Sequence, residues 1–376
     1  MKLFLCGDVM PARGVDQILP HPGDPALHEP HLRDARSYVA AAEARNGPIR
    51  RPVGFAWPWG SALRAIEEAA PDVRVINLES SITRDGHFAA DKGLHYRMAP
   101  DNVDCLRVAR PDVCSLANNH VLDFGREGLV DTLDALSRAG LRWVGAGRDA
   151  AEAKRPVLVG TPRGRVAVFG CGTASSGIPS SWAATSRRPG VHFLPDLSDR
   201  RATELAAEIR EQTRPGDIVV ASLHWGTNWQ YHVPAEQVRF AHRLIDGGVH
   251  VVHGHSSHHP QPIEVYRGKL VLHGCGDLID DYEGIAGYEC YRDDLRLLFF
   301  ATLTPTGDLA DLRMLPMQAR RMRLHPASTT DAEWLRTTLT RVSADFGTKI
   351  TRTGGTLHAH VQLRSGPPGS AQPMSS

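Results

Sequence analysis

Hydrophobic residues in this chain come in short runs that are separated by amphipathic segments. Runs rich in β-branched residues, at residues 75–78 and 218–223 for example, predict buried strands. Residues 61–70, 125–140 and 235–245 carry apolar side chains at helical spacing and predict helices. Because strands alternate with helices in this way, we expect an α/β fold with a mostly parallel sheet and helices on its faces.

A second series of strands and helices begins near residue 157. It contains predicted strands at 166–170, 218–223 and 249–252, and predicted helices at 201–212 and 235–245. We expect residues 269–273 and 295–303 to form antiparallel strands that close this second sheet. Two series in succession permit a layered sandwich of two sheets.

Three further segments suggest the domain organisation. Residues 11–58 are loaded with Pro, Gly and His, and such a long segment predicts a lid or insertion loop within a domain that spans residues 1–320. Thr330-Asp331-Ala332-Glu333 reads as a capping box, so we expect a C-terminal helical extension over residues 321–350. Residues 365–376 are rich in Pro, Gly and Ser, and we expect a disordered tail there.

Five of the predicted strands end at residue types that bind metal ions. These residues are Asp8, Glu79, Asn119 with His120, His224, and His253 with His255. The carboxyl ends of parallel strands meet at one edge of a sheet, so we expect these side chains and the nearby His258 to form one cluster. Carboxylate, amide and imidazole ligands suit one or two divalent ions, with Mn, Zn, Fe, Mg and Ca as candidates.

Composition excludes several other classes of protein. The 43 Lys and Arg residues nearly balance the 42 Asp and Glu residues, which argues against a nucleic-acid or membrane-surface binder. No apolar run reaches about 18 residues, and the N-terminus leads directly into the first predicted strand. The six cysteines show no CxxC pairing and predict free thiols, so we expect a cytoplasmic protein.

Five motifs stand in a characteristic order along the chain. They are Gly7-Asp8-Val9-Met10, Asn77-Leu78-Glu79-Ser80, Ala117-Asn118-Asn119-His120, His224-Trp225-Gly226 and Gly254-His255-Ser256-Ser257-His258. Together they resemble the CapA family of poly-γ-glutamate capsule synthesis proteins, which are similar to the calcineurin-like metallophosphoesterases. The resemblance implies an α/β fold of the calcineurin-like type, a layered αββα sandwich of two mixed sheets flanked by helices.

The resemblance also implies metal ligands. Asp8 would hold a first ion, Glu79 would occupy the bridging position, and Asn119 and His224 would hold a second ion. The superfamily's Asp-x-His opening is Asp8-Val9-Met10 here, and a methionine is a poor ligand for a hard cation. Two-metal hydrolysis needs both ions, so phosphatase chemistry does not follow directly from the resemblance.

The histidines carry further implied roles. His255 and His258 replace the paired histidines of the Gly-His-x-His motif, with one residue more between them. This leaves open which of His253, His255 and His258 are ligands. His120 matches the histidine that donates to, or protonates, an oxygen of the substrate.

A metal ion beside acid and base groups can support epimerisation as well as hydrolysis. An ion on a carbonyl or carboxylate stabilises the charge that develops when a Cα proton leaves. Two groups on opposite faces of that carbon then exchange the proton. The candidate acid and base residues are His120, Asp123, His258, His259 and Asp277.

Three side chains are candidates for substrate contact. Trp225 and Trp229 flank His224 in the sequence and could wall an apolar pocket, although core packing explains them equally well. Arg97 could clamp a carboxylate or a phosphate through a bidentate pair of hydrogen bonds.

Three functions are consistent with these residues. Our leading hypothesis is a metal-dependent peptide epimerase, similar to the CapA-like enzyme that inverts the C-terminal residue of a lasso-peptide precursor, with a peptide or peptide-like substrate. A second is a metal-dependent phosphoester or amide hydrolase. A third is a poly-γ-glutamate synthesis or assembly factor in which the metal is structural. The number of subunits stays open.

Overall fold

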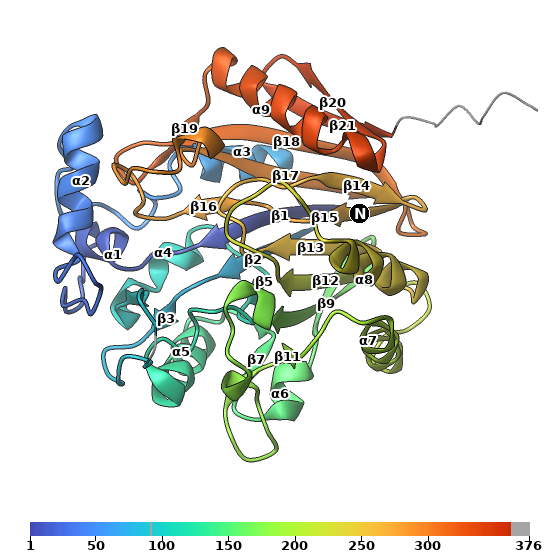
Figure 1. The fold of residues 1–376 in the computed structure, drawn as a ribbon, viewed down its shortest axis with the longest axis horizontal. Coiled ribbons are helices and arrows are strands. Elements are labelled where there is room, and N and C mark those ends of the chain that lie inside the picture. Colours follow the sequence, from blue (N-terminus) through green and yellow to red (C-terminus); the bar gives the residue numbers. More distant parts are fainter. Residues whose placement is uncertain (91, 362–376) are drawn as a thin grey trace, which may run out of the picture.

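The computed structural model describes residues 1–90 and 92–361. Two β-sheets lie face to face in the middle of the molecule, and helices surround them (Figure 1). Apolar side chains fill the space between the sheets and the space beneath the helices on either outer face. The layered αββα sandwich of two mixed sheets is therefore confirmed.

The first sheet has ten strands within the described residues, in the order β20-β21-β18-β17-β1-β2-β5-β6, with β16 beside β1 and β19 beside β18. Strands β1, β2, β5, β6 and β16 are parallel, and β17 pairs antiparallel with β1. The bounds are β1 (Lys2–Val9), β2 (Val73–Leu78), β5 (Val113–Ser115), β6 (Trp143–Val144), β16 (Asp277–Ile279), β17 (Leu295–Leu303), β18 (Leu309–Ala319), β19 (Leu324–Pro326), β20 (Thr348–Thr353) and β21 (Thr356–Val361).

The second sheet has seven strands in the described part of the chain, in the order β11-β9-β12-β13-β15-β14, with β8 beside β9. Its central strands are parallel, whereas β8 and β14 are antiparallel edge strands. The bounds are β8 (Val157–Thr161), β9 (Gly164–Thr173), β11 (Phe193–Leu194), β12 (Ile218–His224), β13 (Val251–His255), β14 (Ile263–Tyr266) and β15 (Lys269–Leu272).

Helices and small strand pairs complete the layers. The α-helices are α1 (Gly14–Ile18), α2 (Arg36–Asn46), α3 (Ser61–Ala69), α4 (Asp104–Arg107), α5 (Gly125–Arg138), α6 (Ala150–Lys154), α7 (Asp199–Glu211), α8 (Ala235–Asp246) and α9 (Thr329–Val342). Two short pairs are β3 (Ser81–Ile82) with β4 (Arg97–Met98), and β7 (Ala146–Gly147) with β10 (Gly190–Val191). Short 3-10 turns are η1 (Pro100–Asn102), η2 (Ala174–Ser176), η3 (Ser180–Trp182), η4 (Glu289–Tyr291) and η5 (Ala344–Phe346).

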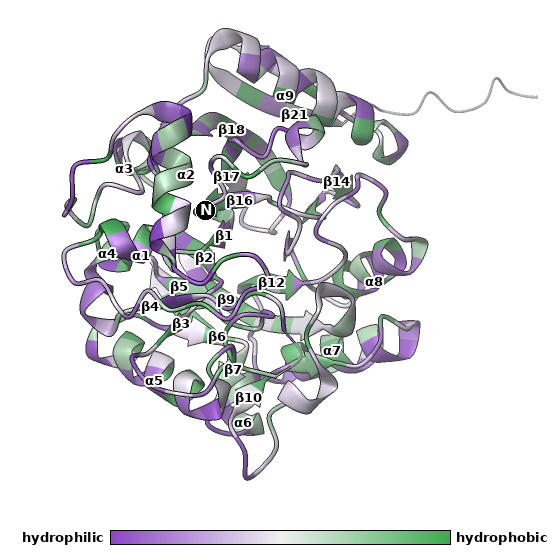
Figure 2. Cartoon of the chain, turned by 60° about the vertical axis from the view of Figure 1, so that its left-hand side comes forward, coloured by the Kyte–Doolittle hydropathy of each residue, from purple (hydrophilic) through white to green (hydrophobic). Residues whose placement is uncertain are grey.

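The alternation of side chains along each strand explains the sandwich. On β1, Leu3 and Leu5 point into the core between the two sheets, whereas Phe4 and Cys6 point to the outer core beneath helices. Successive strand residues face opposite sides, so a strand that is apolar at every position must be covered on both. Helices α7 and α8 cover the outer face of the second sheet, and both carry hydrophobic and hydrophilic residues on different sides (Figure 2).

One of two strand assignments made from the sequence was wrong. We expected residues 269–273 and 295–303 to close the second sheet as antiparallel strands. Strand β15 does lie in the second sheet, where it pairs antiparallel with β14 and parallel with β13. Strand β17 belongs to the first sheet, where it pairs with β1. Alternating apolar and polar residues indicate that a segment is a strand, but they do not identify the strand with which it pairs.

The expected insertion at residues 11–58 is more ordered than its composition suggested. It contains α1 and α2, and buried side chains such as Val15, Ile18 and Val39 pack it against the outer core of the first sheet. The many Pro and Gly residues of this segment are typical of turns, so the sequence did not predict these helices. Whether the segment opens as a lid stays a prediction.

The C-terminal part is also richer than a helical extension. Helix α9 is present, but its N-cap is Ser328, whose side chain accepts a hydrogen bond from the Asp331 backbone. The strands β19, β20 and β21 flank the helix and enlarge the first sheet. The tail expected at residues 365–376 lies outside the described residues.

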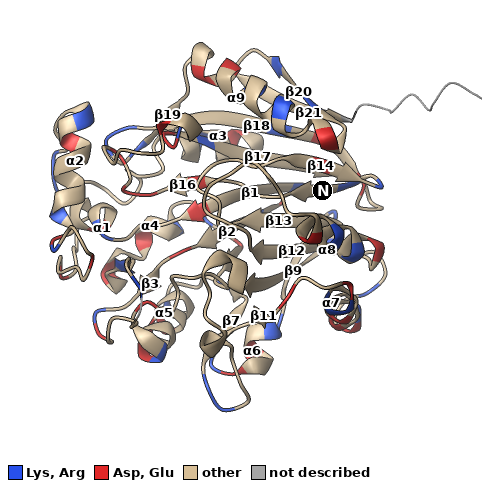
Figure 3. Cartoon of the chain, viewed as in Figure 1, with Lys and Arg blue, Asp and Glu red and all other residues tan. Residues whose placement is uncertain are grey.

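Charged side chains lie mainly on the outer helices and loops, and the strands of the two sheets carry few of them (Figure 3). Within residues 1–90 and 92–361, no helix has both the length and the apolar character needed to cross a membrane.

Candidate metal centre

Strand register gathers the candidate ligands at one edge of the sandwich. On the first sheet, Asp8 lies opposite Asn77 of β2 and Asp277 of β16. On the second sheet, His224 lies opposite His255. A glycine at position 7 permits the close approach of β1 to the chain before β16, because a Cβ there would lie 1.6 Å from the carbonyl oxygen of Gly276.

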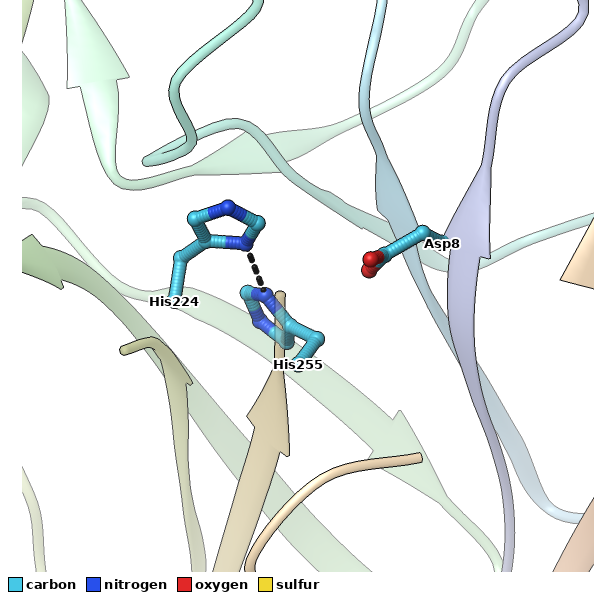
Figure 4. A group of neighbouring side chains, drawn as sticks. All are labelled: Asp8, His224 and His255. Atoms are coloured by element: carbon cyan, nitrogen blue, oxygen red, sulfur yellow. Dashed lines mark hydrogen bonds between the residues drawn. The ribbon is translucent and has the colours of Figure 1, made fainter. Parts of the chain in front are cut away.

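Two groups of three ligand atoms share one aspartate. Asp8, His224 and His255 offer atoms within 4.8 Å of one another, and so do Asp8, His258 and Asp277. The carboxylate of Asp8 points from β1 toward the two imidazoles (Figure 4). The Oδ2 atoms of Asp8 and Asp277 are buried and have no hydrogen-bond partner among the described residues. Buried carboxylate oxygens without partners are what a cation would satisfy, so these residues fit divalent ions.

The carboxylates of this centre repel one another. Burial and then the charge of Asp277 raise the pKa of Asp8 to about 7. Burial and then Asp8 raise the pKa of Glu79 well above its ordinary value. Burial lowers the pKa of His258, but Asp277 and Asp8 oppose that effect and raise the pKa overall. A bound divalent cation would relieve this repulsion and keep the carboxylates ionised.

The imidazoles of His224 and His255 face each other through their Nδ1 atoms at 2.8 Å (Figure 4). Two nitrogens that each lie about 2.1 Å from one ion are about 3–3.4 Å apart, so a small adjustment would let both bind the same ion. Burial lowers the pKa of both rings well below the ordinary value, and neutral imidazole is the form that binds metals. Ser222 Oγ contacts Nε2 of His255 at 2.9 Å and fixes that ring.

Asn119 and Glu79 lie beside this histidine pair. Asn119 Oδ1 is 2.9 Å from Nε2 of His224. Glu79 Oε1 is 3.7 Å from the same nitrogen and 3.9 Å from Nε2 of His120. The shared position between the two groups belongs to Asp8, whereas the resemblance assigned the bridging position to Glu79. Glu79 lies between His224 and His120, and its bridging role stays a prediction.

His120 forms a pair with Asp123 next to the centre. Its Nδ1 atom is 2.6 Å from Oδ2 of Asp123, which places a proton on Nδ1 and leaves Nε2 facing Glu79. Burial lowers the pKa of His120 to about 3, although Asp123 opposes the effect, so the ring is neutral. The ring of Tyr96 lies against it at a tilt of 35°, with centroids 3.9 Å apart. A neutral imidazole held in one tautomer by a carboxylate is suited to proton transfer.

The open question about three histidines has a geometric answer. His255 and His258 belong to the two ion groups, whereas Nε2 of His253 lies 2.7 Å from the carbonyl oxygen of Cys6 and its Nδ1 lies 3.1 Å from Ser222 Oγ. His253 therefore ties the two sheets together. Met10 packs with Tyr96 and Ala12.

Two of the expected substrate contacts lie away from the centre. Trp225 is 1% exposed, donates from its indole to the carbonyl of His273 and packs against Phe240, so it belongs to the core. This corrects the expectation that it walls a pocket: β12 ends at His224, and the side chain of the next residue packs into the outer core with Leu223 and Phe240. Arg97 lies over the ring of Phe124 and pairs with Asp24 at 3.7 Å. Within the described residues it contacts neither ion group.

Trp229 and His259 belong to an aromatic cluster beside His258. The rings of Trp229 and Tyr288 stack at 3.9 Å, and Trp229 lies 5.2 Å from the ring of His258. His259 packs between Tyr231 and Tyr291, and burial lowers its pKa to about 4. Its Nδ1 atom faces the carbonyl of Pro260, so it is poorly placed to serve as an acid or base at the centre.

Several supporting residues had no signal in the sequence. The amide of Asn77 donates to Asp8 at 2.7 Å and to Glu79 at 2.9 Å, and only its place in the Asn77-Leu78-Glu79 motif hinted at this. Lys92 contacts Asp123 and the Asn119 carbonyl, and Asn228 bonds Nε2 of His258 at 3.0 Å. Both lie in loops without a motif, where no pattern could have found them.

These features define a layered α/β protein with a candidate metal centre at the carboxyl edge of its two sheets. The chain belongs to the bacterial capsule synthesis protein PGA_cap family, whose model matches residues 2–282. The matched region includes every residue of the two ion groups, so the CapA resemblance of the sequence is confirmed.

Two curated relatives carry informative names. The chain is 54% identical over 353 residues to a probable polyglutamine synthesis accessory protein of Mycobacterium tuberculosis, and the alignment covers 93% of each chain. It is 29% identical over 246 residues to the PGA biosynthesis protein CapA of Bacillus subtilis, covering 63% of this chain and 60% of that protein.

A solved structure with a similar arrangement is that of a 5′-nucleotidase precursor from Thermus thermophilus. The TM-score is 0.44 at 18% identity, and the match covers 75% of this chain. The chain spans about half of that nucleotidase, 52% of its length.

Proposed function

We propose that this chain is a divalent-metal-dependent hydrolase that cleaves amide bonds of a glutamate or glutamine polymer. The observation that carries the proposal is the pair of ion groups sharing Asp8, with the His120–Asp123 pair directly beside them. The substrate class rests on the names of the relatives, which concern polyglutamine synthesis and PGA biosynthesis.

The chain's own residues supply a simple order of events. Divalent ions, when bound at these groups, polarise the substrate's carbonyl oxygen and lower the pKa of water. Asp123 holds His120 with its free Nε2 toward the centre, where it accepts a proton from the attacking water. The same nitrogen then returns the proton to the leaving amine. The burial of Asp8 and His224 keeps bulk water away from the reacting atoms.

Epimerisation, our leading hypothesis from the sequence, makes a different demand on the site. It needs two separate proton-transferring groups on opposite faces of one carbon. Asp277 and His258 form one of the ion groups, and His259 faces the Pro260 carbonyl. The His120–Asp123 pair is then the one acid and base unit among the expected residues that is free of an ion group and also faces the centre. This arrangement supports hydrolysis better than two-base epimerisation.

We also propose the cellular compartment and the partner of the enzyme. The six cysteines are all free thiols, and five are buried, which supports a reducing compartment such as the cytoplasm. The partner is a peptide-like polymer. A phosphoester substrate, and an accessory role in which the ions only stabilise the fold, are alternatives that the same experiment tests.

The deciding experiment loads metal-depleted protein with Mn²⁺, Zn²⁺, Mg²⁺ or Ca²⁺ and incubates it with glutamine and glutamate oligomers in H₂¹⁸O or D₂O. Mass spectrometry distinguishes cleavage with ¹⁸O uptake from deuterium gain at Cα without cleavage. An aryl phosphodiester is assayed in parallel.

Matched variants identify the source of any activity. His120→Gln should lose about 10²–10⁴-fold in rate with unchanged metal content, whereas His360→Gln, which changes an exposed side chain of β21, should be unaffected. Absence of any reaction with every ion would refute the enzyme and support the accessory role.

A further inference from the structure

A cavity outside the candidate metal centre is lined in part by Tyr282. It has a volume of about 440 Å³, which is within the usual range of small-molecule sites. Three segments far apart in the sequence form it: the end of α2 with Arg45, the loop after β16 with Asp293, and the end of β18 with Arg320. In Figure 1, α2 lies at the left, beside the loops that follow β16 and precede β19.

The segments around the cavity are held in place independently of any ligand. The side chain of Asn46 in α2 donates to Glu283 of the loop, and Arg320 donates to Asn46 at 3.3 Å. The backbone amides of Arg321 and Met322 donate to the same Glu283 carboxylate. The cavity is thus a formed feature of the fold.

A buried arginine in the cavity wall has an unused donor. Arg296 is 1% exposed, and it pairs with Asp280 and donates to the carbonyl of Asp293. Its Nε atom has no hydrogen-bond partner among the described residues. Buried guanidinium donors are almost always satisfied, so this atom indicates that an acceptor such as a carboxylate belongs nearby.

Charges of both signs also lie in the same wall, where Arg45 is near Glu289 and Asp293 is near Arg296. Arg45 and Asp293 form no ion pair within the described part of the chain, although both line the cavity. The Asp293 side chain is half-buried, where a carboxylate gains more from a nearby cation than it would in open water. A purely anionic ligand would be repelled by Asp293 and its acidic neighbours, and a purely cationic one by the arginines.

We propose that this cavity binds the head group of an α-amino acid, with its carboxylate toward Arg45 and Arg296 and its ammonium toward Asp293. Two sources can supply this head group. One is free glutamine or glutamate. The other is the amino end of a γ-linked glutamate chain, because a γ-linkage leaves both the α-ammonium and the α-carboxylate of the first residue free. An α-linked chain leaves only the ammonium.

One tyrosine connects the cavity to the metal centre. Tyr282 lines the cavity, and its ring meets the ring of His258 edge-on at 5.3 Å. Its hydroxyl bonds that of Tyr96, whose ring lies against His120. We place the next linkage of a chain held here on the side of Tyr282 that faces the proposed catalytic groups. The inference adds to the proposed function the end of the polymer that is recognised. Only this recognition of a polymer rests on the proposed function; binding of a free amino acid does not.

The test is calorimetric titration of the full chain, with and without chelator, so that it does not depend on activity. The probes are L-glutamine, L-glutamate, γ-glutamyl-glutamate, α-glutamyl-glutamate, glutarate and putrescine. We expect the free amino acids or the γ-linked dipeptide to bind at least about 10-fold more tightly than glutarate, putrescine and the α-linked dipeptide. Preference between the free amino acids and the γ-linked dipeptide identifies the source.

Variants at exposed or half-buried positions avoid the buried Arg296. Arg45→Gln and Asp293→Asn should each weaken binding at least about 10-fold, whereas Arg36→Gln, on the same helix but outside the cavity, should not. Binding that survives both cavity variants, equal binding of all probes, or no binding by folded protein would each overturn the proposal. Binding without hydrolysis would retain this site and reject only the proposed function.

Discussion

Asp8 and Asp277 lie opposite each other on the parallel strands β1 and β16, and each has a buried carboxylate oxygen without a hydrogen-bond partner among the described residues. Asp8 belongs to both ion groups, but Asp277 belongs to one. The two aspartates should therefore differ in how many ions depend on them, which a substitution at each can measure.

Asp8→Asn should abolish binding of both ions, whereas Asp277→Asn should remove one and leave the ion of the histidine pair. Elemental analysis after reconstitution gives the ion count per chain, and Asp101→Asn on the exposed surface serves as the control. Equal losses in the two variants would contradict the sharing of Asp8.

Ion removal should also change stability in a way that depends on Asp8. A ligand at 100 times its Kd stabilises the folded state by about 2.7 kcal/mol, so the wild-type Tm should rise with metal and fall with chelator. Asp8→Asn removes one member of a repelling carboxylate cluster, so it should unfold no earlier than wild type in chelator and show no response to metal. Thermal unfolding with and without ion checks both, and a metal-dependent Tm in Asp8→Asn would count against the site.

Lys92 should act as a positioning residue for His120. Its Nζ atom contacts the carboxylate of Asp123 and lies 3.3 Å from Nδ1 of His120. Lys92→Met should lower kcat about 10- to 100-fold with little change in KM, and Lys92→Arg should restore part of it. A Lys92→Met enzyme with the wild-type kcat would show that the contact is only structural.

The two tryptophans that flank His224 in the sequence should respond differently to truncation. Trp225→Ala empties a core position beside Phe240 and should cost about 3–5 kcal/mol of unfolding free energy. Trp229→Ala removes a half-buried ring that stacks on Tyr288 and should cost much less. Denaturant unfolding measures both, and similar losses would place Trp229 in the core as well.

Acid should weaken the fold partly through His192. Burial lowers the pKa of His192 to about 4 in the folded protein, from about 6.5 in the unfolded chain. Between these values the unfolded chain binds more protons, so stability is complete above pH 6.5 and falls as the pH drops toward 4, by about 3 kcal/mol from this residue.

His192→Gln should flatten part of that slope. Other buried histidines should account for the rest of the slope of unfolding free energy against pH. Urea unfolding at pH 7, 5.5 and 4.5 checks this against His31→Gln, which changes an exposed ring. An unchanged slope in His192→Gln would show that the folded protein takes up the proton as readily as the unfolded chain.

The sequence predicted the strand ends well because they follow from local patterns. Apolar runs that finish at Asp8, Glu79 and His224 identify parallel strands, and parallel strands must end at one edge. The meeting of Asp8 with His224 and His255 could therefore be expected. The same reasoning could not reveal the register of Asp277 opposite Asp8, because β16 is only three residues long.

Other features depend on tertiary contacts that leave no local trace. Strand β17 pairs with β1 because its side chains pack into the cores on the two faces of the first sheet. The alternation of its residues is compatible with a place in either sheet, so the sequence does not identify its partner. Asn228 and Lys92 reach the site from irregular loops, where neither periodicity nor motif marks them. Trp225 and Trp229 are two tryptophans only four positions apart, so the sequence does not distinguish them. In the fold, Trp225 packs against Phe240 in the core, whereas Trp229 stacks on Tyr288 near the surface.

The amide of Asn77 has one further implication. Both of its N–H bonds are used, one on Asp8 and one on Glu79, while its oxygen accepts from Asn118 at 3.1 Å. A planar amide holds its two hydrogens at a fixed angle, so neither acid can shift without disturbing the other. Ions of different radius would then strain this rigid arrangement to different degrees, and the selectivity of the site among divalent metals would be set by a residue that never contacts one.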